Sequence, residues 1–400
     1  MPGQNNNEIR HFMGWKKGAF SHRSLWLLIF LSVSGCTDTG NSPLVFSNTS
    51  PPDNAKNVHG AMPMIKELEN TIEMELVAGS QLFDSRTSLA SIGGGIAGSG
   101  EVITSYMRSY LKHAVITNDL MYLGRSELVI SAAATETLLH DCPECMQDFD
   151  ENNTLFLSGG AAGSYSMLCR DKVTSLSDVK GKKFRAVGAN RRWVRALGGV
   201  PVSLSITDMV EGLSRGLVSC IVGPIAWLKT FPITDEVNYV YAYNAGAFNF
   251  ATMVINRDRW DNFTESQKQA MWQAQPGLSA RNVIRLYIAD AIRARMLARE
   301  KGILIVEGGQ DVDRFWEEFK QSEVEIVNEL SKSFGVQDPQ RIADSFVRNI
   351  GKWQMIISQS NLTEVLDMEE IDESRLSVAV EEYTQLLRDN IYEGIDPLEL

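Results

Sequence analysis

The feature that most constrains the fold is an alternation of strand-like and helix-like segments that begins at Leu44. The short apolar run Leu44–Phe46 is followed by a helical pattern from Asn57 to Asn70 and then by the strictly alternating run Thr71–Val77. Apolar spacing near 3.6 indicates a helix, and strict alternation indicates a half-buried strand. Strand, helix and strand in this order predict a βαβ unit.

The same alternation continues along the chain. We expect further strands, with helices between them, at Leu128–Ala132, Thr154–Ser158, Lys183–Val187, Val218–Val222, Tyr239–Tyr243, Ala251–Ile255 and Ile303–Val306. Such a pattern predicts an α/β fold with mostly parallel sheets. Apolar residues at helical spacing predict a long helix from Gly277 to Glu300. With 400 residues, of which 44% are hydrophobic, the chain is long and apolar enough for two packed lobes.

The N-terminus has the pattern of an export signal. Basic residues precede an apolar run, 25–33, that is too short to span a bilayer. The run ends in Val33-Ser-Gly-Cys36, which resembles the lipobox of bacterial lipoproteins; an ordinary cleavage site or a buried cysteine is the alternative. We therefore predict a lipoprotein signal peptide over 1–35, acylation of Cys36 and a polar tether over 36–43.

Charge excludes one large class of function. The formal net charge is −12, whereas proteins that bind nucleic acid present basic surfaces. We therefore expect no nucleic-acid partner.

The other four cysteines can form disulfides in an oxidising compartment. Cys142-Pro-Glu-Cys145 has the spacing of a redox motif or of half a zinc site, but neither a thioredoxin-like βαβ context nor a second Cys pair accompanies it. We predict a local structural disulfide between Cys142 and Cys145. Cys169 and Cys220 can pair or stay buried as thiols, and the sequence leaves both open.

Two motifs that suggest enzymes have the wrong context. Gly93–Gly98 fits G-x-G-x-x-G, but it follows a predicted helix and precedes a predicted strand, the reverse of a dinucleotide fingerprint. Gly212–Gly216 fits G-x-S-x-G with the same reversed order. No common metal or nucleotide motif is present, so we predict a binding protein with no catalytic residues, no cofactor and no metal.

Four segments together resemble one protein family. They are "IEMELVAGSQLFD" from Ile72, "SLSDVKGKKFRA" from Ser175, "ALGGVPVSLSITDMVEGLSRGLVSCIVGP" from Ala196 and "ATMVINRDRWDNFTESQKQAM" from Ala251. The chain from about Leu44 to Gln340 is similar to the DctP-type solute-binding proteins of tripartite ATP-independent periplasmic (TRAP) transporters.

The resemblance implies a two-lobed periplasmic-binding-protein fold, type II-like, with hinge strands and a long bracing helix. Lobe one is expected to comprise 44–162 and about 250–285, and lobe two 163–249 and about 286–340. Residues 341–400 lie beyond the family's usual end, and we expect this C-terminal helical extension to pack on lobe two.

The resemblance also assigns a role to Arg185. The matching arginine of the family pairs with the ligand carboxylate, and the planar guanidinium suits that geometry. Without the resemblance, an arginine in a strand would be a solvated or structurally paired group. Tyr165 stands near where some members carry a second arginine, and it can donate a phenolic hydrogen bond. Gly223 replaces an asparagine of other members.

Further ligand-binding candidates follow from position. Trp193 and Trp227 can form aromatic walls, although each can equally be a core residue. The remaining candidates lie where the family's chain faces the cleft or crosses between lobes: Gln81, Tyr106, Phe248 and Asn249. Tyr106 can equally be a buried core ring.

These observations predict an extracytoplasmic solute-binding protein that captures a small organic acid. The expected partners are the acid and the permease subunits of a TRAP importer, which an ion gradient drives. The expected location is the periplasm, with a lipid anchor in a bacterial membrane. The alternatives are an ABC-type solute-binding protein, which would have the same two lobes, and a sensory ligand-binding lipoprotein.

Overall fold

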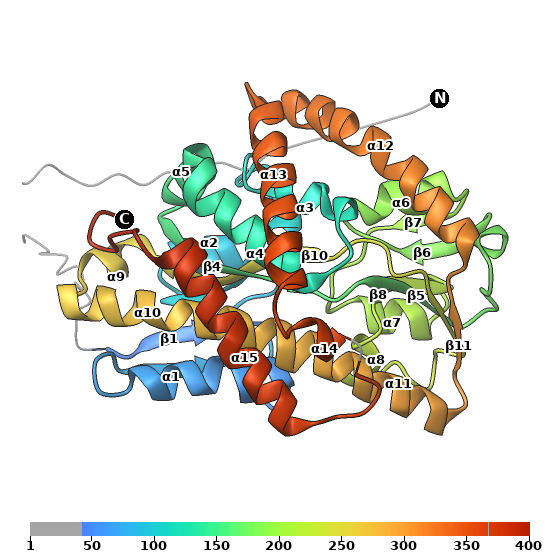
Figure 1. The fold of residues 1–400 in the computed structure, drawn as a ribbon, viewed down its shortest axis with the longest axis horizontal. Coiled ribbons are helices and arrows are strands. Elements are labelled where there is room, and N and C mark those ends of the chain that lie inside the picture. Colours follow the sequence, from blue (N-terminus) through green and yellow to red (C-terminus); the bar gives the residue numbers. More distant parts are fainter. Residues whose placement is uncertain (1–41, 367) are drawn as a thin grey trace, which may run out of the picture. The chain divides into compact units, whose positions relative to one another are not determined.

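The computed structural model describes residues 42–366 and 368–400, which form two mixed β-sheets surrounded by helices (Figure 1). The first sheet has the order β2-β1-β3-β10-β4. Its strands are β1 (Leu44–Ser47), β2 (Met74–Val77), β3 (Ser99–Val102), β4 (Thr154–Ala162) and β10 (Phe248–Asn256). The predicted signal peptide, Cys36 and most of the predicted tether lie outside the described residues.

The second sheet has the order β11-β9-β5-β8-β6-β7. Its strands are β5 (Tyr165–Cys169), β6 (Lys183–Arg185), β7 (Val200–Val202), β8 (Cys220–Pro224), β9 (Tyr239–Ala242) and β11 (Leu304–Glu307). The α/β class that the alternation predicts is confirmed.

Both sheets are less parallel than the alternation predicts. In the first sheet β10 runs antiparallel to β3 and β4, and in the second β5 runs antiparallel to β8 and β9. These two strands are the ones that arrive directly from the other sheet, β5 after β4 and β10 after β9. Parallel pairing within one sheet requires a crossover connection such as a βαβ unit, and these two strands follow a connection from the other sheet instead.

The helices near the first sheet come from both halves of the chain. They are η1 (Lys56–Ala61), α1 (Met62–Leu68), α2 (Ser88–Gly93), η2 (Thr104–Tyr106), α3 (Val115–Asp119), η3 (Met121–Leu123), α4 (Glu127–Glu136), η4 (Thr137–Asp141), α5 (Pro143–Asp150) and α9 (Arg257–Asp261). The second sheet carries η5 (Leu176–Val179), α6 (Asn190–Ala196), α7 (Met209–Ser214) and α8 (Trp227–Thr230), and α12 (Gln310–Ser333) follows β11.

One predicted strand is wrong. Leu128–Ala132 lies in α4, which begins after Ser126, whose hydroxyl accepts a hydrogen bond from the backbone of Val129. The residues from Leu128 to Thr135 are all buried. A short run that is apolar on every side looks the same in a buried helix as in a buried strand, so periodicity alone does not separate them.

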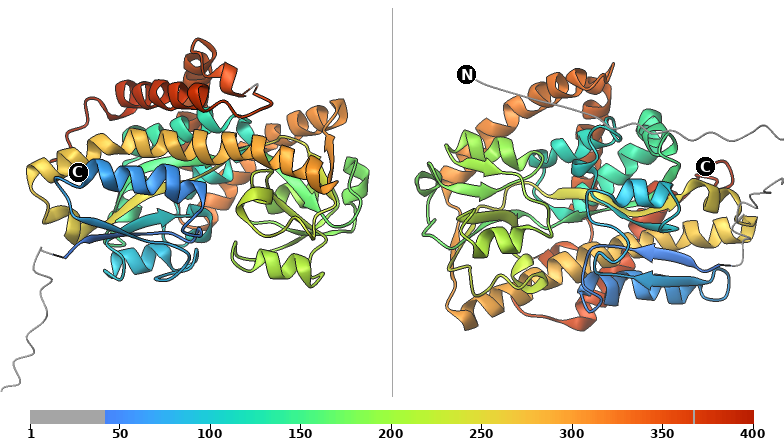
Figure 2. Two further views of the ribbon diagram at one scale, coloured as in Figure 1. Left: turned by 90° about the horizontal axis from the view of Figure 1, so that it is seen from below. Right: turned by 180° about the vertical axis from the view of Figure 1, so that it is seen from behind.

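The predicted long helix is present and longer than expected. It comprises α10 (Glu265–Arg281), η6 (Asn282–Ile288) and α11 (Ala289–Lys301) without a break. Thr264 begins it with a capping box, in which its hydroxyl and the side chain of Gln267 each bond the other residue's backbone. Figure 2 shows this helix passing along both sheets, and its two ends contact β4 and α8 respectively.

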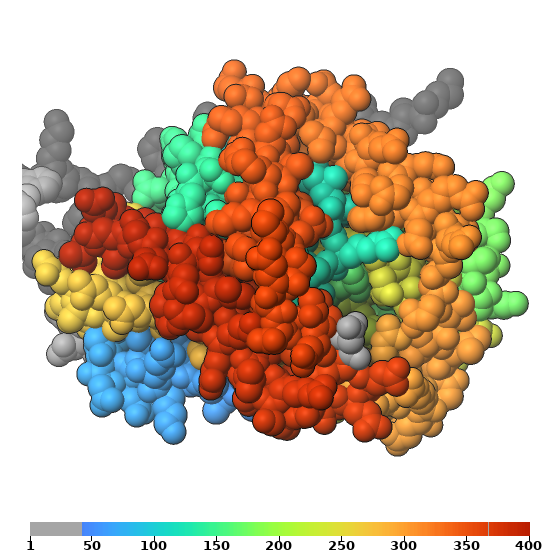
Figure 3. All heavy atoms as spheres, in the orientation of Figure 1, coloured from blue at the N-terminus to red at the C-terminus, as the bar shows by residue number. Residues whose placement is uncertain are grey.

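The C-terminal extension packs on the first sheet's side, so the expectation that it packs on lobe two is wrong. Its helices are α13 (Pro339–Ser358), α14 (Thr363–Leu366), α15 (Glu373–Leu387) and η7 (Arg388–Tyr392). α13 contacts α3 and α4, and α15 contacts α10. Their buried side chains share one hydrophobic core with the first sheet. Figure 3 shows this segment, in red, covering the middle of one face.

Buried hydrogen bonds tie the extension to that core. The indole nitrogen of Trp353 donates to Glu136 at 2.6 Å, and the hydroxyl of Tyr383 donates to the backbone oxygen of Leu128 at 2.6 Å. The hydroxyl of Tyr392 donates to the backbone oxygen of Leu157 at 3.1 Å. The extension is therefore part of the folded unit.

No helix among the described residues combines the length and the apolar character that crossing a bilayer requires.

Both cysteine pairs are bonded in the structure. Cys142 caps α5 and is joined to Cys145, and Cys169 of β5 is joined to its cross-strand neighbour Cys220 of β8. The second bond is the pairing that the sequence left open.

We expect Trp353→Ala to lower the free energy of unfolding by about 3–5 kcal/mol, because it removes a large buried side chain and leaves a cavity. Urea denaturation measures this. The matched control is Met355→Ala on the same helix, where the side chain is 61% exposed and the expected change is within about 0.5 kcal/mol. Equal effects of the two substitutions would contradict the packing of α13.

We expect a peptide map of the unreduced protein to contain Cys142 and Cys145 joined and unmodified by an alkylating reagent. After reduction both should react. Alkylation of either residue without reduction would show that this disulfide is absent.

Candidate functional site

Arg185 is the last residue of β6 and is almost fully buried, with 1% of its surface exposed. Its strand is held between β7 and β8, which fixes the direction of the side chain. The Nε atom donates to the backbone oxygen of Leu204 at 3.1 Å, and an Nη atom donates to the hydroxyl of Tyr106 at 2.7 Å. Neither partner carries a formal charge. A buried guanidinium with only neutral partners is costly unless an anion joins it.

The bond to Tyr106 links the two sheets. Tyr106 lies in η2, directly after β3 of the first sheet, whereas Arg185 belongs to the second sheet. The neighbouring backbones also approach, because a Cβ atom on Gly188 would lie 3.5 Å from the Cβ atom of Ser105. The Oγ atom of Ser105 and the Oδ1 atom of Asn118 are buried there, and neither has a hydrogen-bond partner among the residues that the structure describes. The ends of β3 and β6 therefore meet at a junction with unused polar groups.

The indole ring of Trp227 lies beside the guanidinium of Arg185. The guanidinium carbon lies 5.5 Å from the centre of the indole, which permits a cation–π interaction. The indole lies against Gly223, where a Cβ atom would come within 2.2 Å of Cζ3 of Trp227. The absence of a side chain at Gly223 therefore leaves the space that the ring of Trp227 occupies.

Tyr165 and Phe248, on the two crossover strands, add two further aromatic rings next to Trp227. Tyr165 begins β5 and Phe248 begins β10, and their rings stack with centres 5.7 Å apart. The ring of Tyr165 also lies 6.1 Å from that of Trp227. Burial raises the pKa of Tyr165 far above its ordinary value although Arg185 acts in the opposite direction, so the phenol stays neutral and can donate a hydrogen bond.

The ring of Trp193 packs against other aromatic rings. It is fully buried in an aromatic cluster, with ring centres 4.8 Å from Tyr122 and 5.3 Å from Tyr243. Phe315 and Phe319 of α12 meet its ring edge-on. This packing favours the alternative role of a core residue, which attaches α12 to the second sheet.

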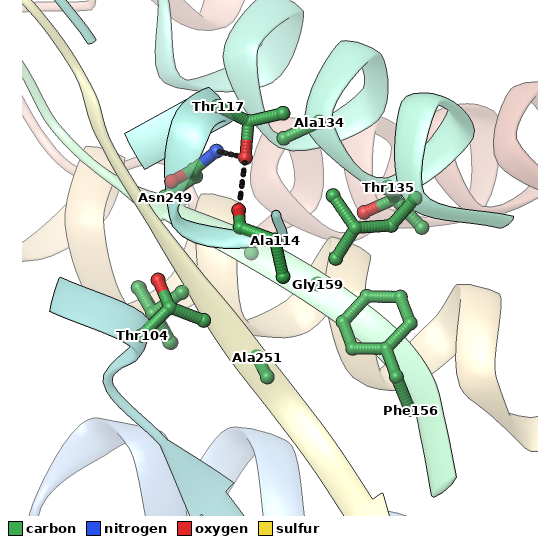
Figure 4. Close-up of a pocket in the computed structure, with 12 residues that line it drawn as sticks. Thr104, Ala114, Thr117, Ala134, Thr135, Phe156, Gly159, Asn249 and Ala251 are labelled. Atoms are coloured by element: carbon green, nitrogen blue, oxygen red, sulfur yellow. Dashed lines mark hydrogen bonds between the residues drawn. The ribbon is translucent and has the colours of Figure 1, made fainter. Parts of the chain in front are cut away.

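No hydrogen bond joins Asn249 or Gln81 to Arg185 among the described residues. The side chain of Asn249 donates to the hydroxyl of Thr117 at 3.0 Å, and its backbone oxygen accepts from Asn118 at 2.6 Å. Asn249 lines a small cavity within the first sheet and its helices, with room for about 10 Å³, roughly one water molecule (Figure 4). Gln81 is exposed in the loop after β2.

A further charged contact involves α6, the helix that follows Arg185 in the chain. Arg192 of α6 donates to both carboxylate oxygens of Glu323 in α12, at 3.0 and 2.6 Å. It also donates to the backbone oxygen of Asp119, at the end of α3, at 2.7 Å. The helix that follows Arg185 is thereby held to both sides of the junction.

Sequence reasoning missed Lys56 and Glu101. Lys56 begins η1 and Glu101 lies within β3, and their side chains form an ion pair with 10% and 6% of their surfaces exposed. The sequence contains one indication of a special role for Glu101, because a charged residue inside a buried strand is unusual. It contains no such indication for Lys56, since its partner lies 45 residues further along the chain.

A comparison with protein-family models identifies the family of this chain. Residues 48–329 match the model of the bacterial extracellular solute-binding proteins, family 7, the DctP family. The chain belongs to this family. The family predicted from the sequence is confirmed, and the matched region ends before α13, so this solute-binding protein carries its extension beyond it.

Solved structures show the same fold. A TRAP solute-binding protein from Rhodoferax ferrireducens in complex with benzoate is 16% identical, with a TM-score of 0.70 over 79% of this chain and 99% of that one. One from Bordetella bronchiseptica with bound mandelate is 18% identical, with a TM-score of 0.67 over 78% and 99%. The ectoine-binding protein of Halomonas elongata is 15% identical, with a TM-score of 0.68 over 78% and 100%. The predicted two-lobed fold is confirmed.

We expect Gly223→Ala to destabilise this solute-binding protein by about 1–3 kcal/mol, because the new methyl group must displace Trp227. Chemical denaturation measures the change. Gly351→Ala is the control, since nothing lies within 4 Å of the position of its Cβ atom and alanine is the better helix former. The control should be neutral or stabilising, and equal destabilisation of both variants would contradict the role of Gly223.

Proposed function

We propose that this protein captures a small organic acid outside the cytoplasm and delivers it to a TRAP-type importer. The observation that carries the proposal is Arg185: a buried guanidinium at the junction of the two sheets, whose hydrogen bonds within the described part of the chain go only to neutral groups. Its planar fork matches the two oxygens of a carboxylate.

The surroundings of Arg185 suit the rest of such a ligand. Trp227, Tyr165 and Phe248 present ring surfaces next to the guanidinium, so an acid with an apolar body gains burial as well as charge pairing. The neutral hydroxyl of Tyr165 adds a hydrogen-bond donor. Family relatives whose structures contain benzoate or mandelate support this ligand class, because both compounds are aromatic carboxylates.

Capture follows from the two-sheet arrangement. The chain crosses between the sheets where β4 leads to β5 and where β9 leads to β10, and such short crossovers serve as hinges in two-lobed binding proteins. Closure on an acid would remove the ion pair from water, which is favourable only if the remaining polar groups are also paired. Ser105, Asn118 and Tyr106 supply polar groups on the opposite side.

Delivery and anchoring belong to the same proposal. The closed protein would present the acid to membrane permease subunits. An acylated Cys36 would hold it at the surface of a bacterial membrane, and the residues after Cys36 would be its tether.

Thermal-shift screening of the purified protein against small carboxylates and sulfonates tests the proposal, because a ligand that binds only the native state raises the melting temperature. We expect carboxylates with an apolar body to be hits. We expect Arg185→Ala to abolish the shift and Arg185→Lys to weaken binding roughly 10- to 100-fold, since an ammonium does not reproduce the bidentate geometry.

Arg191→Lys is the matched control, because Arg191 is exposed on the next helix. Its affinity should equal that of the unchanged protein. Retained tight binding by Arg185→Lys, or the absence of any acid hit, would overturn the assignment.

A further inference from the structure

A row of four aromatic rings leads away from Arg185. The row consists of Trp227, Tyr165, Phe248 and Phe250, and its first three members follow one another at ring distances of 6.1 and 5.7 Å. Phe250 is two residues after Phe248 in β10, so both side chains lie on the same face of the strand. Phe250 also belongs to the same hydrophobic cluster as Tyr165 and Phe248.

The far end of the aromatic row carries a second buried cation. The ammonium of Lys56 lies 4.9 Å from the centre of the Phe250 ring, as the guanidinium of Arg185 lies over Trp227 at the near end. The two ends differ in charge, however. Over residues 42–366 and 368–400, Arg185 has only neutral hydrogen-bond partners, whereas Lys56 is paired with Glu101.

Tyr287 packs beside the same end of the row. Its ring is 6.0 Å from that of Phe250. Burial raises the pKa of Tyr287 well above its ordinary value, and the negative charge of Glu101 adds to the rise. Because the ammonium of Lys56 lies over the ring of Phe250, the ion pair that it forms with Glu101 lies beside this end of the aromatic row.

The Lys56–Glu101 pair has unused hydrogen-bonding capacity. An ammonium has three donors and a carboxylate about four acceptor positions. Among the described residues, the side chains of Lys56 and Glu101 hydrogen-bond only each other. A buried ion pair offsets its desolvation only when its remaining donors and acceptors are also satisfied. A neutral group that both donates and accepts, such as a hydroxyl, would satisfy them.

We propose that Lys56 and Glu101 form a second polar subsite, which selects acids that carry a neutral hydrogen-bonding group at the end remote from the carboxylate. This inference rests on the proposed function, in which Arg185 binds the carboxylate. Glu101 neutralises Lys56, so a second carboxylate at this end meets no net positive charge and is disfavoured.

Isothermal titration with matched aromatic acids tests the inference. The probes are phenylacetate, 3- and 4-hydroxyphenylacetate, and 1,4-phenylenediacetate, which carries a second carboxylate. We expect at least one hydroxylated acid to bind roughly tenfold tighter than phenylacetate, about the value of one hydrogen bond, and the diacid to bind more weakly than that hydroxylated acid. Equal affinities for phenylacetate and both hydroxylated acids, or preference for the diacid, would overturn the subsite.

Two variants separate a subsite from a structural ion pair. Lys56→Met with Glu101→Leu replaces the pair by apolar side chains of similar size and should abolish the preference for the hydroxyl while phenylacetate still binds. Glu101→Gln leaves the charge of Lys56 unbalanced, and we expect it to shift the ratio of affinities roughly tenfold toward the diacid. An unchanged ratio in Glu101→Gln would overturn the subsite even if the double variant does not fold.

Lys352→Met is the control for losing a lysine. Lys352 also pairs with a glutamate, Glu136, at 2.7 Å and also lies over an aromatic ring, Trp353, but it belongs to α13. Its preferences among the acids should match those of the unchanged protein. If Arg185→Ala loses all acid binding but the Lys56 and Glu101 variants keep the preferences of the unchanged protein, the subsite is refuted and the proposed function stands. Absence of acid binding in the unchanged protein would overturn both.

Discussion

The buried charge of Arg185 is the constraint on which the rest of the site depends. A guanidinium keeps its proton at every physiological pH, so burial does not neutralise it. The protein offers it a backbone oxygen and a phenol, which orient the group without cancelling its charge. Among the described residues, the guanidinium therefore has no anionic hydrogen-bond partner at the junction of the two sheets. The proposed carboxylate ligand would supply the complementary charge, and this is how the proposal links the fold to solute capture.

The two crossovers bring residues of both sheets to one junction. Because β5 and β10 arrive from the opposite sheet, their first residues, Tyr165 and Phe248, lie at the junction and stack on each other. The antiparallel strands that distinguish these sheets from purely parallel ones thus also supply the aromatic side chains beside Arg185. The long helix of α10, η6 and α11 runs along both sheets and contributes Tyr287 to the same region.

The C-terminal extension distinguishes this protein from the region that the family model describes. That region ends at residue 329, whereas α13 and α15 bury aromatic side chains against the first sheet's helices. α12 connects the two regions: it packs Phe315 and Phe319 on Trp193 and pairs Glu323 with Arg192, and then leads to α13. The extension thereby adds a layer to one sheet and is attached to the other through α12.

Sequence by itself determined the features that depend on local pattern: the α/β class, the long helix, the family and the position of Arg185 in a short strand. Those features follow from periodicity and from motifs of neighbouring residues. Local pattern did not distinguish a buried helix from a buried strand at Leu128, because both are apolar on every side. Only the tertiary structure placed Tyr106 against Arg185, the ring of Trp227 on Gly223, and Lys56 beside Glu101. These contacts join residues far apart in the chain, and whether a tryptophan lies beside Arg185, as Trp227 does, or in an aromatic cluster, as Trp193 does, depends on what packs on it from elsewhere in the chain.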